Sequence, residues 1–316
     1  MSAQPIFIAT RGSALALAQA NMVLAECRKK FPNLVFELKI IKSTGDKLQT
    51  ASMSKPDASL PKGLFTKELE MALLKSKADL AVHSLKDLPT ELPEGLTLGG
   101  VAGKRADVRD ALIYRAAIKP KTKLADLPHG LTIATSSTRR KAQILALRPD
   151  FKVVEIRGNV PTRLKKLAGQ PEICATVLAT AGLSRLHYMI TAGGRLKGVE
   201  VPSGLGVTIL DTSEMLPCVG QGAIGLEIRG NDDRAAEICR SLNDEDTFRS
   251  VVAERALLRA LGGGCQMPIG AHAWVEAGEL HLRAVSFLTE KPRRAEGKTS
   301  PAEAAALGQR VAAQLM

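Results

Sequence analysis

The chain has 316 residues, of which 45% are hydrophobic and 24% charged, and its formal net charge is +12. This length suits two or three globular domains, and no apolar run approaches the roughly 20 residues of a membrane helix. A basic chain needs an anionic partner, yet 3% aromatic residues provide little surface on which nucleic-acid bases could stack. The expected ligand is therefore a small molecule with several negative charges, with neither nucleic acid nor membrane as a partner.

The first half of the predicted fold begins with an alternation of strands and helices. We expect strands at 5–10, 34–43 and 78–84 and helices at 13–30 and 63–77. This β-α-β order predicts a parallel, doubly wound sheet. The polar, lysine-containing segment 44–62 is long for a loop, and we expect it to act as a mobile lid.

The same pattern then returns. Strands are expected at 131–137, 152–159 and 175–180, each followed by a helix. The triplet Ile-Ala-Thr ends the first strand of both halves, at 8–10 and 133–135, and in each case a serine-containing turn leads into a helix. We therefore expect two similar α/β halves that face each other across a cleft, with ligands at the carboxyl ends of the strands.

After residue 230 the pattern changes to a small α+β domain. We expect helices at 232–242 and 246–261, a β-hairpin within 271–287 and a final helix at about 301–315. With the return segment that the family resemblance given below implies, the predicted domains are 1–103 with 212–230, then 104–211, then 231–316.

The stretch LGGGCQMPIG, residues 261–270, isolates one thiol after three glycines. One interpretation is a helix C-cap at Gly262 with Cys265 as a small buried residue. The other is that the glycines let the backbone approach a bulky group and that Cys265 carries chemistry. The local pattern leaves both interpretations open.

Five cysteines are widely spaced along the chain, and no two form a C-x-x-C pair. This excludes the usual zinc and disulfide patterns, so we expect no metal. The beginning of the sequence shows no signal-peptide pattern, and we expect a cytoplasmic protein.

Candidate anion-binding residues lie where strands end and helices begin. Serine and asparagine hydroxyl or amide groups can cap helices there, and arginines bind carboxylates in bidentate fashion. For one such site alone, ordinary capping and a solvated basic face would be the simpler explanation, but two corresponding sites favour anion binding. The candidates are Arg11, Ser13, Thr135, Ser136, Ser137, Arg139, Arg140, Arg157, Asn159 and Arg163.

The segment AVHSLKDLPTELP, 81–93, ends an apolar strand in a polar loop. Ser84, Lys86 and Asp87 lie at the expected carboxyl edge of the sheet. Asp87 is either a surface partner of Lys86 or the carboxylate that stabilises a cationic reaction centre. We interpret His83, just inside the strand, as a core residue.

Nine blocks of the chain together resemble the porphobilinogen deaminase family, over residues 6 to about 290. They are RGSALALAQ, KSTGDK, GLFTKELE, AVHSLKDLPT, ATSSTRR, IRGNVPTRLKKL, LATAGLSRL, VGQGAIGLEIR and LGGGCQMPIG. The resemblance implies two halves similar to periplasmic binding proteins and a third domain with a dipyrromethane cofactor, linked through a thioether.

The resemblance also implies the reaction and the site. Four porphobilinogen molecules are joined head to tail with loss of ammonia, and the linear tetrapyrrole is then released by hydrolysis. Asp87 would be catalytic, Cys265 would hold the cofactor, Phe65 would be a stacking wall and Gln221 would join the site. The remaining implied residues hold carboxylates of the substrate or cofactor: Arg11, Ser13, Ser84, Lys86, Thr135, Ser136, Ser137, Arg139, Arg140, Arg157, Asn159 and Arg163. The expected state is a monomer.

Two other classes of protein remain as alternatives. A solute-binding protein would share the two-lobed cleft but would not need the third domain. A nucleic-acid-binding protein would use the positive charge directly, and its affinity would fall steeply with salt.

Overall fold

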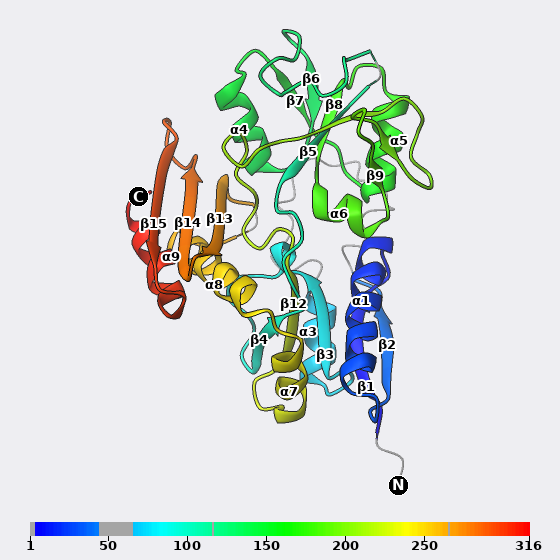
Figure 1. Ribbon diagram of the computed structural model, residues 1–316, viewed down its shortest axis with the longest axis vertical. Helices are drawn as coiled ribbons and strands as arrows, with labels where there is room; N and C mark the ends of the chain where they lie inside the picture. The colour runs from blue at the N-terminus through cyan, green and yellow to red at the C-terminus, as the bar shows by residue number, and fades with distance from the viewer. Residues whose placement is uncertain (1–3, 44–65, 116, 265) are drawn as a thin grey trace.

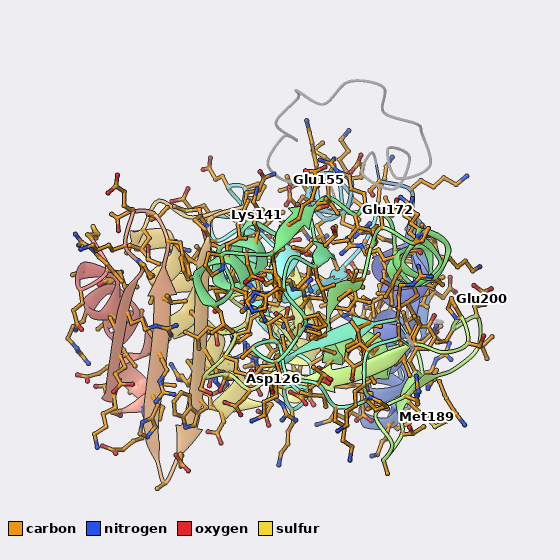
Figure 2. The ribbon with its side chains drawn as sticks, turned by 90° about the horizontal axis from the view of Figure 1, so that it is seen from above. Asp126, Lys141, Glu155, Glu172, Met189 and Glu200 are labelled. Atoms are coloured by element: carbon orange, nitrogen blue, oxygen red, sulfur yellow. The ribbon has the colours of Figure 1, made fainter. Side chains whose placement is uncertain are left out.

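The computed structural model describes residues 4–43, 66–115, 117–264 and 266–316, which form two stacked α/β lobes with a smaller domain at one side (Figure 1). Seen from above, the sheet of the smaller domain stands beside the two lobes (Figure 2). The predicted lid at 44–62, Phe65 and Cys265 lie outside the described residues. The predicted class, two α/β lobes and a small α+β domain, is confirmed.

The first lobe contains a five-stranded sheet in the order β2-β1-β3-β12-β4. Its strands are β1 (Ile6–Arg11), β2 (Phe36–Ile41), β3 (Leu80–Ser84), β4 (Leu96–Val101) and β12 (Ile224–Arg229). β1 is parallel to β2 and β3, as predicted, but β12 is antiparallel to both β3 and β4. The sheet is mixed because β12 returns to this lobe after the chain has passed through the second one.

Among the described residues, three helices cover this sheet: α1 (Ala14–Lys30), α3 (Lys67–Leu74) and α7 (Asp233–Leu242). The predicted boundary at residue 231 put α7 in the third domain, but α7 packs against the first lobe. Its apolar side chains complete the core that α1, β1 and β3 form in the first lobe, and these side chains are Ala235, Ile238, Cys239 and Leu242. The first lobe therefore extends through α7.

The second lobe repeats the plan with a sheet in the order β11-β5-β8-β6-β7. Its strands are β5 (Asp110–Tyr114), β6 (Thr132–Ala134), β7 (Lys152–Val154), β8 (Ala175–Ala179) and β11 (Gly206–Ile209). Its helices are α4 (Thr138–Leu147), α5 (Val160–Gly169) and α6 (Thr180–Arg185), and a short ladder joins β9 (Met189–Ile190) to β10 (Leu196–Lys197). α6 contacts α1 of the first lobe (Figure 1).

The third domain packs α8 (Glu245–Ala260) and α9 (Ala304–Ala313) on a three-stranded antiparallel sheet. The predicted hairpin is β13 (Ile269–Glu276) with β14 (Glu279–Ser286), and β15 (Arg293–Thr299) adds an edge strand. β15 was not predicted because its sequence, RRAEGKT, is charged, as edge strands often are. α8 lies between this sheet and the first lobe (Figure 1).

A buried carboxylate joins all three parts of the molecule. Glu254 of α8 is fully buried, and its carboxylate accepts hydrogen bonds from both Nη atoms of Arg105, at 2.7 and 2.9 Å. It also accepts the backbone N–H groups of Gly220 and Ala273, at 2.7 and 2.8 Å. Arg105 and Gly220 lie on the two segments that connect the lobes. The Glu254 side chain therefore holds both connecting segments to the third domain. Among the described residues, no helix is long and apolar enough to cross a bilayer.

Candidate active site

A cavity of about 300 Å³ opens beside the loop that follows β3. Asp87 ends the single turn Leu85–Asp87 at the carboxyl end of β3, and its side chain is exposed to this cavity. Gly263 and Gly264, the residues that precede Cys265, line the same cavity. The loop of the first lobe and the glycine run of the third domain therefore meet, although 176 positions separate Asp87 from Gly263 (263 − 87).

The glycine run has a backbone that other residues rarely adopt. Gly262 and Gly263 have φ angles of 91° and 37°, and their N–H groups cap the end of α8 by donating to Arg259 and Leu258 carbonyls at 3.0 and 2.8 Å. The C-cap interpretation is thus correct for the first glycines. It does not account for Gly264, which lines the cavity.

The loop after Asp87 is held from the third domain. Arg255 of α8 donates to the carbonyls of Leu88 and Pro89, at 3.1 and 2.6 Å, and Arg259 donates to that of Thr90. Burial lowers the pKa of Arg255 to about 10, with the neighbouring Arg259 adding to the effect. The position of Asp87 therefore depends on α8 as well as on its own lobe.

Positive charge gathers around Asp87 from both lobes. Lys86 is half-buried, and its pKa is lowered by burial and by Arg140, against the raising effect of Asp87. Arg163 of α5 has a pKa lowered to about 10 by burial and by Arg140, again opposed by Asp87. Lys86 and Arg163 therefore each lie within electrostatic reach of Asp87 and Arg140.

Arg163 has an unusual environment for a cation. Its Nε donates to the Gly158 carbonyl at 2.7 Å, and among the described residues no carboxylate lies within ion-pair distance of it. A half-buried guanidinium in this situation gains from an anionic ligand.

Arg139 and Arg140 were expected to hold ligand carboxylates, but the structure pairs both with a buried aspartate. Asp110 accepts hydrogen bonds from Nη2 of Arg139, at 2.8 Å, and from Nη2 of Arg140, at 2.7 Å. It also accepts Nε2 of Gln221, the third predicted site residue in this group, at 2.9 Å. Although burial opposes it, the two guanidiniums hold the pKa of Asp110 well below its usual range.

One further guanidinium nitrogen of each arginine also has an internal partner, whereas Nε of Arg139 is buried without one among the described residues. Arg139 donates to the Leu216 carbonyl at 2.6 Å and Arg140 to the Val177 carbonyl at 2.8 Å. These two arginines, with Gln221, therefore form an internal framework behind the cavity. The positive charge of Arg140 also acts on Lys86 and Arg163.

Three predicted site residues cap helices. Ser13, Ser137 and Asn159 are the N-caps of α1, α4 and α5, and each side chain accepts the N–H of the residue three positions on. This is the capping role that the sequence alone also allowed.

Three further predicted residues make local or neighbouring hydrogen bonds. Ser84 donates to Oε1 of Gln19 at 3.0 Å, Thr135 accepts the Ser137 N–H at 3.2 Å, and Ser136 donates to the Ile156 carbonyl at 2.8 Å. These hydrogen bonds shape the turns at the strand ends.

Arg11 and Arg157 lie in different surroundings. A small hollow of about 60 Å³ brings Arg11, Ser13 and Ser84 together with Asp87, so that these predicted residues share one site. Arg157 is exposed and pairs only loosely with Glu155, at 3.2 Å.

Arg185, which was not among the predicted site residues, is a half-buried cation like Arg163. Arg185 ends α6, which begins directly after β8, and it donates to the Gly222 carbonyl at 2.6 Å while its Nε is buried without a partner among the described residues. Burial lowers its pKa to about 10. The signal was present in the block LATAGLSRL, where an arginine follows the carboxyl end of a strand. Cys218 also lines the cavity beside Asp87.

Comparison with known proteins gives consistent matches along the chain. The family model "Porphobilinogen deaminase, dipyromethane cofactor binding domain" matches residues 6–237, and "Porphobilinogen deaminase, C-terminal domain" matches residues 248–316. The porphobilinogen deaminase of Syntrophobacter fumaroxidans is 42% identical over 318 residues, with 100% of this chain and 96% of the relative covered. That of Chlorobium phaeobacteroides is 45% identical over 279 residues, with 88% and 82% covered.

Solved structures give a weaker likeness. The periplasmic aliphatic sulphonate binding protein SsuA of Escherichia coli has 16% sequence identity and a TM-score of 0.40, with 83% of this chain and 71% of that one covered. The two-lobed architecture described here rests on the strand pairings above.

Proposed function

This chain belongs to the porphobilinogen deaminase family, and from that we propose that Asp87 is its catalytic carboxylate and Cys265 the residue that carries its cofactor. The enzyme is a transferase of porphyrin biosynthesis that condenses four porphobilinogen molecules head to tail with loss of ammonia. The observation that carries the proposed assignment is the cavity, which Asp87 and the glycines before Cys265 line together.

A dipyrromethane bears several carboxylates on its two rings, and the chain has cations that can pair with them. Lys86 lines the cavity, and Arg163 and Arg185 are half-buried cations with no carboxylate within ion-pair distance among the described residues. We propose that these three, with Arg11, hold carboxylates of the cofactor and the growing chain. When bound, the cofactor supplies the pyrrole ring to which the first substrate is joined.

Asp87 can stabilise the charge that develops during loss of ammonia. As the C–N bond of porphobilinogen breaks, the nitrogen leaves with the electron pair and positive charge spreads over the ring. A fixed carboxylate beside the ring lowers this barrier because it interacts more strongly with the transition state than with the ground state. In this proposal Lys86 and Arg163 hold the acetate and propionate groups, which keeps the ring oriented toward Asp87.

We propose three domains for the enzyme, with one change to the predicted limits. The first contains 1–103 and 212–243, so that it includes α7, the second contains 104–211, and the third contains 244–316. We further propose a cytoplasmic monomer, and the four described cysteines, which form no disulfide, are consistent with a reducing compartment.

Replacing Arg163 by leucine is expected to weaken binding of the polycarboxylate without loss of the fold. A hydrogen bond to a charged group contributes about 1.5–3 kcal/mol, so we expect roughly a tenfold to hundredfold rise in KM, together with incomplete cofactor loading. Thermal stability should stay unchanged or rise, since a half-buried cation is removed. Steady-state kinetics, intact mass and thermal unfolding of the same preparation measure these effects.

Lys165 on the same helix provides the matched control, because it is exposed and pairs with Glu200 at 3.2 Å. Lys165→Leu should leave KM and cofactor loading unchanged. If Arg163→Leu also behaved like the parent enzyme, Arg163 would have no part in binding carboxylates.

A further inference from the structure

Three titratable side chains form a buried cluster beneath the catalytic loop: His83 on β3, Glu227 on β12 and Glu70 on α3. Their exposed fractions are 5%, 0% and 7%. Nε2 of His83 lies 2.9 Å from Oε2 of Glu227. The pairing of β3 with β12 sets Gly225 opposite His83, so Glu227 lies two residues along the neighbouring strand, on the same face.

Within the described residues, the two carboxylates of the cluster are hydrogen-bonded only in part. Oε1 of Glu227 and Oε1 of Glu70 are both buried, and neither has a hydrogen-bond donor within the described part of the chain. Burial and the second carboxylate beside it disfavour the charged form of Glu70.

Glu70 connects this cluster to the active site, because it lines the same cavity as Lys86 and Asp87. Burial raises its pKa, and the charges of Glu227 and Glu68 raise it further, whereas a hydrogen bond from Thr66 and the charge of His83 lower it. Arg255 of α8 also acts on Glu227 from the third domain. A carboxylate with these neighbours can take up a proton at a higher pH than an exposed glutamate does.

The condensation requires a group that accepts a proton. When the α-carbon of one pyrrole ring attacks the next substrate, a C–C bond forms and the attacking carbon then carries both the new bond and its hydrogen. The C–H bond must break, its electron pair must return to the ring, and the proton must pass to a base before it leaves with the ammonia as ammonium.

We propose that Glu70, which lines the cavity, is this base and that the buried His83–Glu227 pair is the positioning element beside it. The proposal rests on the proposed function, in which Asp87 stabilises the cation in the same cavity. It assigns separate steps to the two carboxylates: Asp87 acts when the C–N bond breaks, and Glu70 acts when the C–H bond breaks.

The first test needs neither cofactor nor turnover. In ¹³C NMR of the protein labelled at glutamate carboxyl carbons, one resonance that is absent in Glu70→Gln should titrate at higher pH than the exposed glutamates. In Glu227→Gln this resonance should titrate at lower pH, because the neighbouring negative charge is gone. A Glu70 resonance that titrates with the exposed glutamates would overturn the proposal.

The second test uses cofactor-loaded enzyme, with loading verified by intact mass. Glu70→Gln should lower kcat by about 10²–10⁴, as is typical when a general base is removed. With porphobilinogen deuterated at its free α-carbon, this variant should also show a primary isotope effect larger than that of the parent enzyme, because breaking the C–H bond becomes rate-limiting. Glu94→Gln, an exposed glutamate of the same lobe, is the control and should match the parent enzyme.

Turnover within a few-fold of the parent, or a loss of rate without an increased isotope effect, would show that Glu70 has a structural role only. The pH dependence of kcat separates the roles further, since the acidic limb should move to lower pH in Glu227→Gln. If Asp87 were not catalytic, Asp87→Asn would turn over normally while the NMR result stood, so the two proposals can fail independently.

Discussion

Replacing Asp87 by asparagine removes a full negative charge and is expected to lower turnover by at least about 10²–10³, while the protein still folds. Asparagine keeps the size of the side chain and one acceptor oxygen but removes the negative charge that stabilises the developing cation. The backbone should be unaffected, since Asp87 is exposed to the cavity and its loop is held through the carbonyls of Leu88, Pro89 and Thr90.

The measurement is the turnover number together with the intact mass of the same preparation, with preformed hydroxymethylbilane supplied during folding so that the cofactor is loaded. A loaded enzyme with low turnover is the expected result. Near-normal turnover in a loaded Asp87→Asn enzyme would mean that Asp87 is a partner of Lys86 and that another carboxylate is catalytic.

Replacing Arg140 by leucine should act mainly on stability, by about 3–5 kcal/mol. Arg140 makes two contacts with the buried Asp110, at 2.7 and 3.3 Å, and one with the Val177 carbonyl. Its loss leaves Asp110 with Arg139 and Gln221 only, and leaves a buried negative charge less well neutralised. Urea unfolding, with the unfolding slope compared between variants, measures the change.

Arg157→Leu is the control for this prediction, because its loose, exposed pair with Glu155 should contribute less than about 1 kcal/mol. If Arg140→Leu were as stable as the parent, the Asp110 framework would not support the second lobe.

Local patterns predicted the elements that bury an apolar face. The strand at 5–10, the helix from 13 and the strand at 78–84 correspond to β1, α1 and β3, because alternation and helical periodicity are properties of neighbouring residues. The place of β12 was not predictable in this way. Whether residues 224–229 pair with β3, and in which direction, depends on a return from another lobe that no local pattern records.

The site shows the same division. The position of Asp87 at a strand end was accessible from the sequence, whereas its role came from the resemblance. The partners of Arg139 and Arg140 were not accessible, since Asp110 lies 29 and 30 positions away on a different strand. The same holds for His83, which was correctly interpreted as buried but whose partner Glu227 is 144 positions away.

The intact mass of the denatured chain tests the cofactor assignment most directly. A thioether survives unfolding, so active protein should weigh more than its sequence by one dipyrromethane, and peptide mapping should place the excess on Cys265. An unmodified mass from an active preparation, or an excess on any of the other four cysteines, would contradict it.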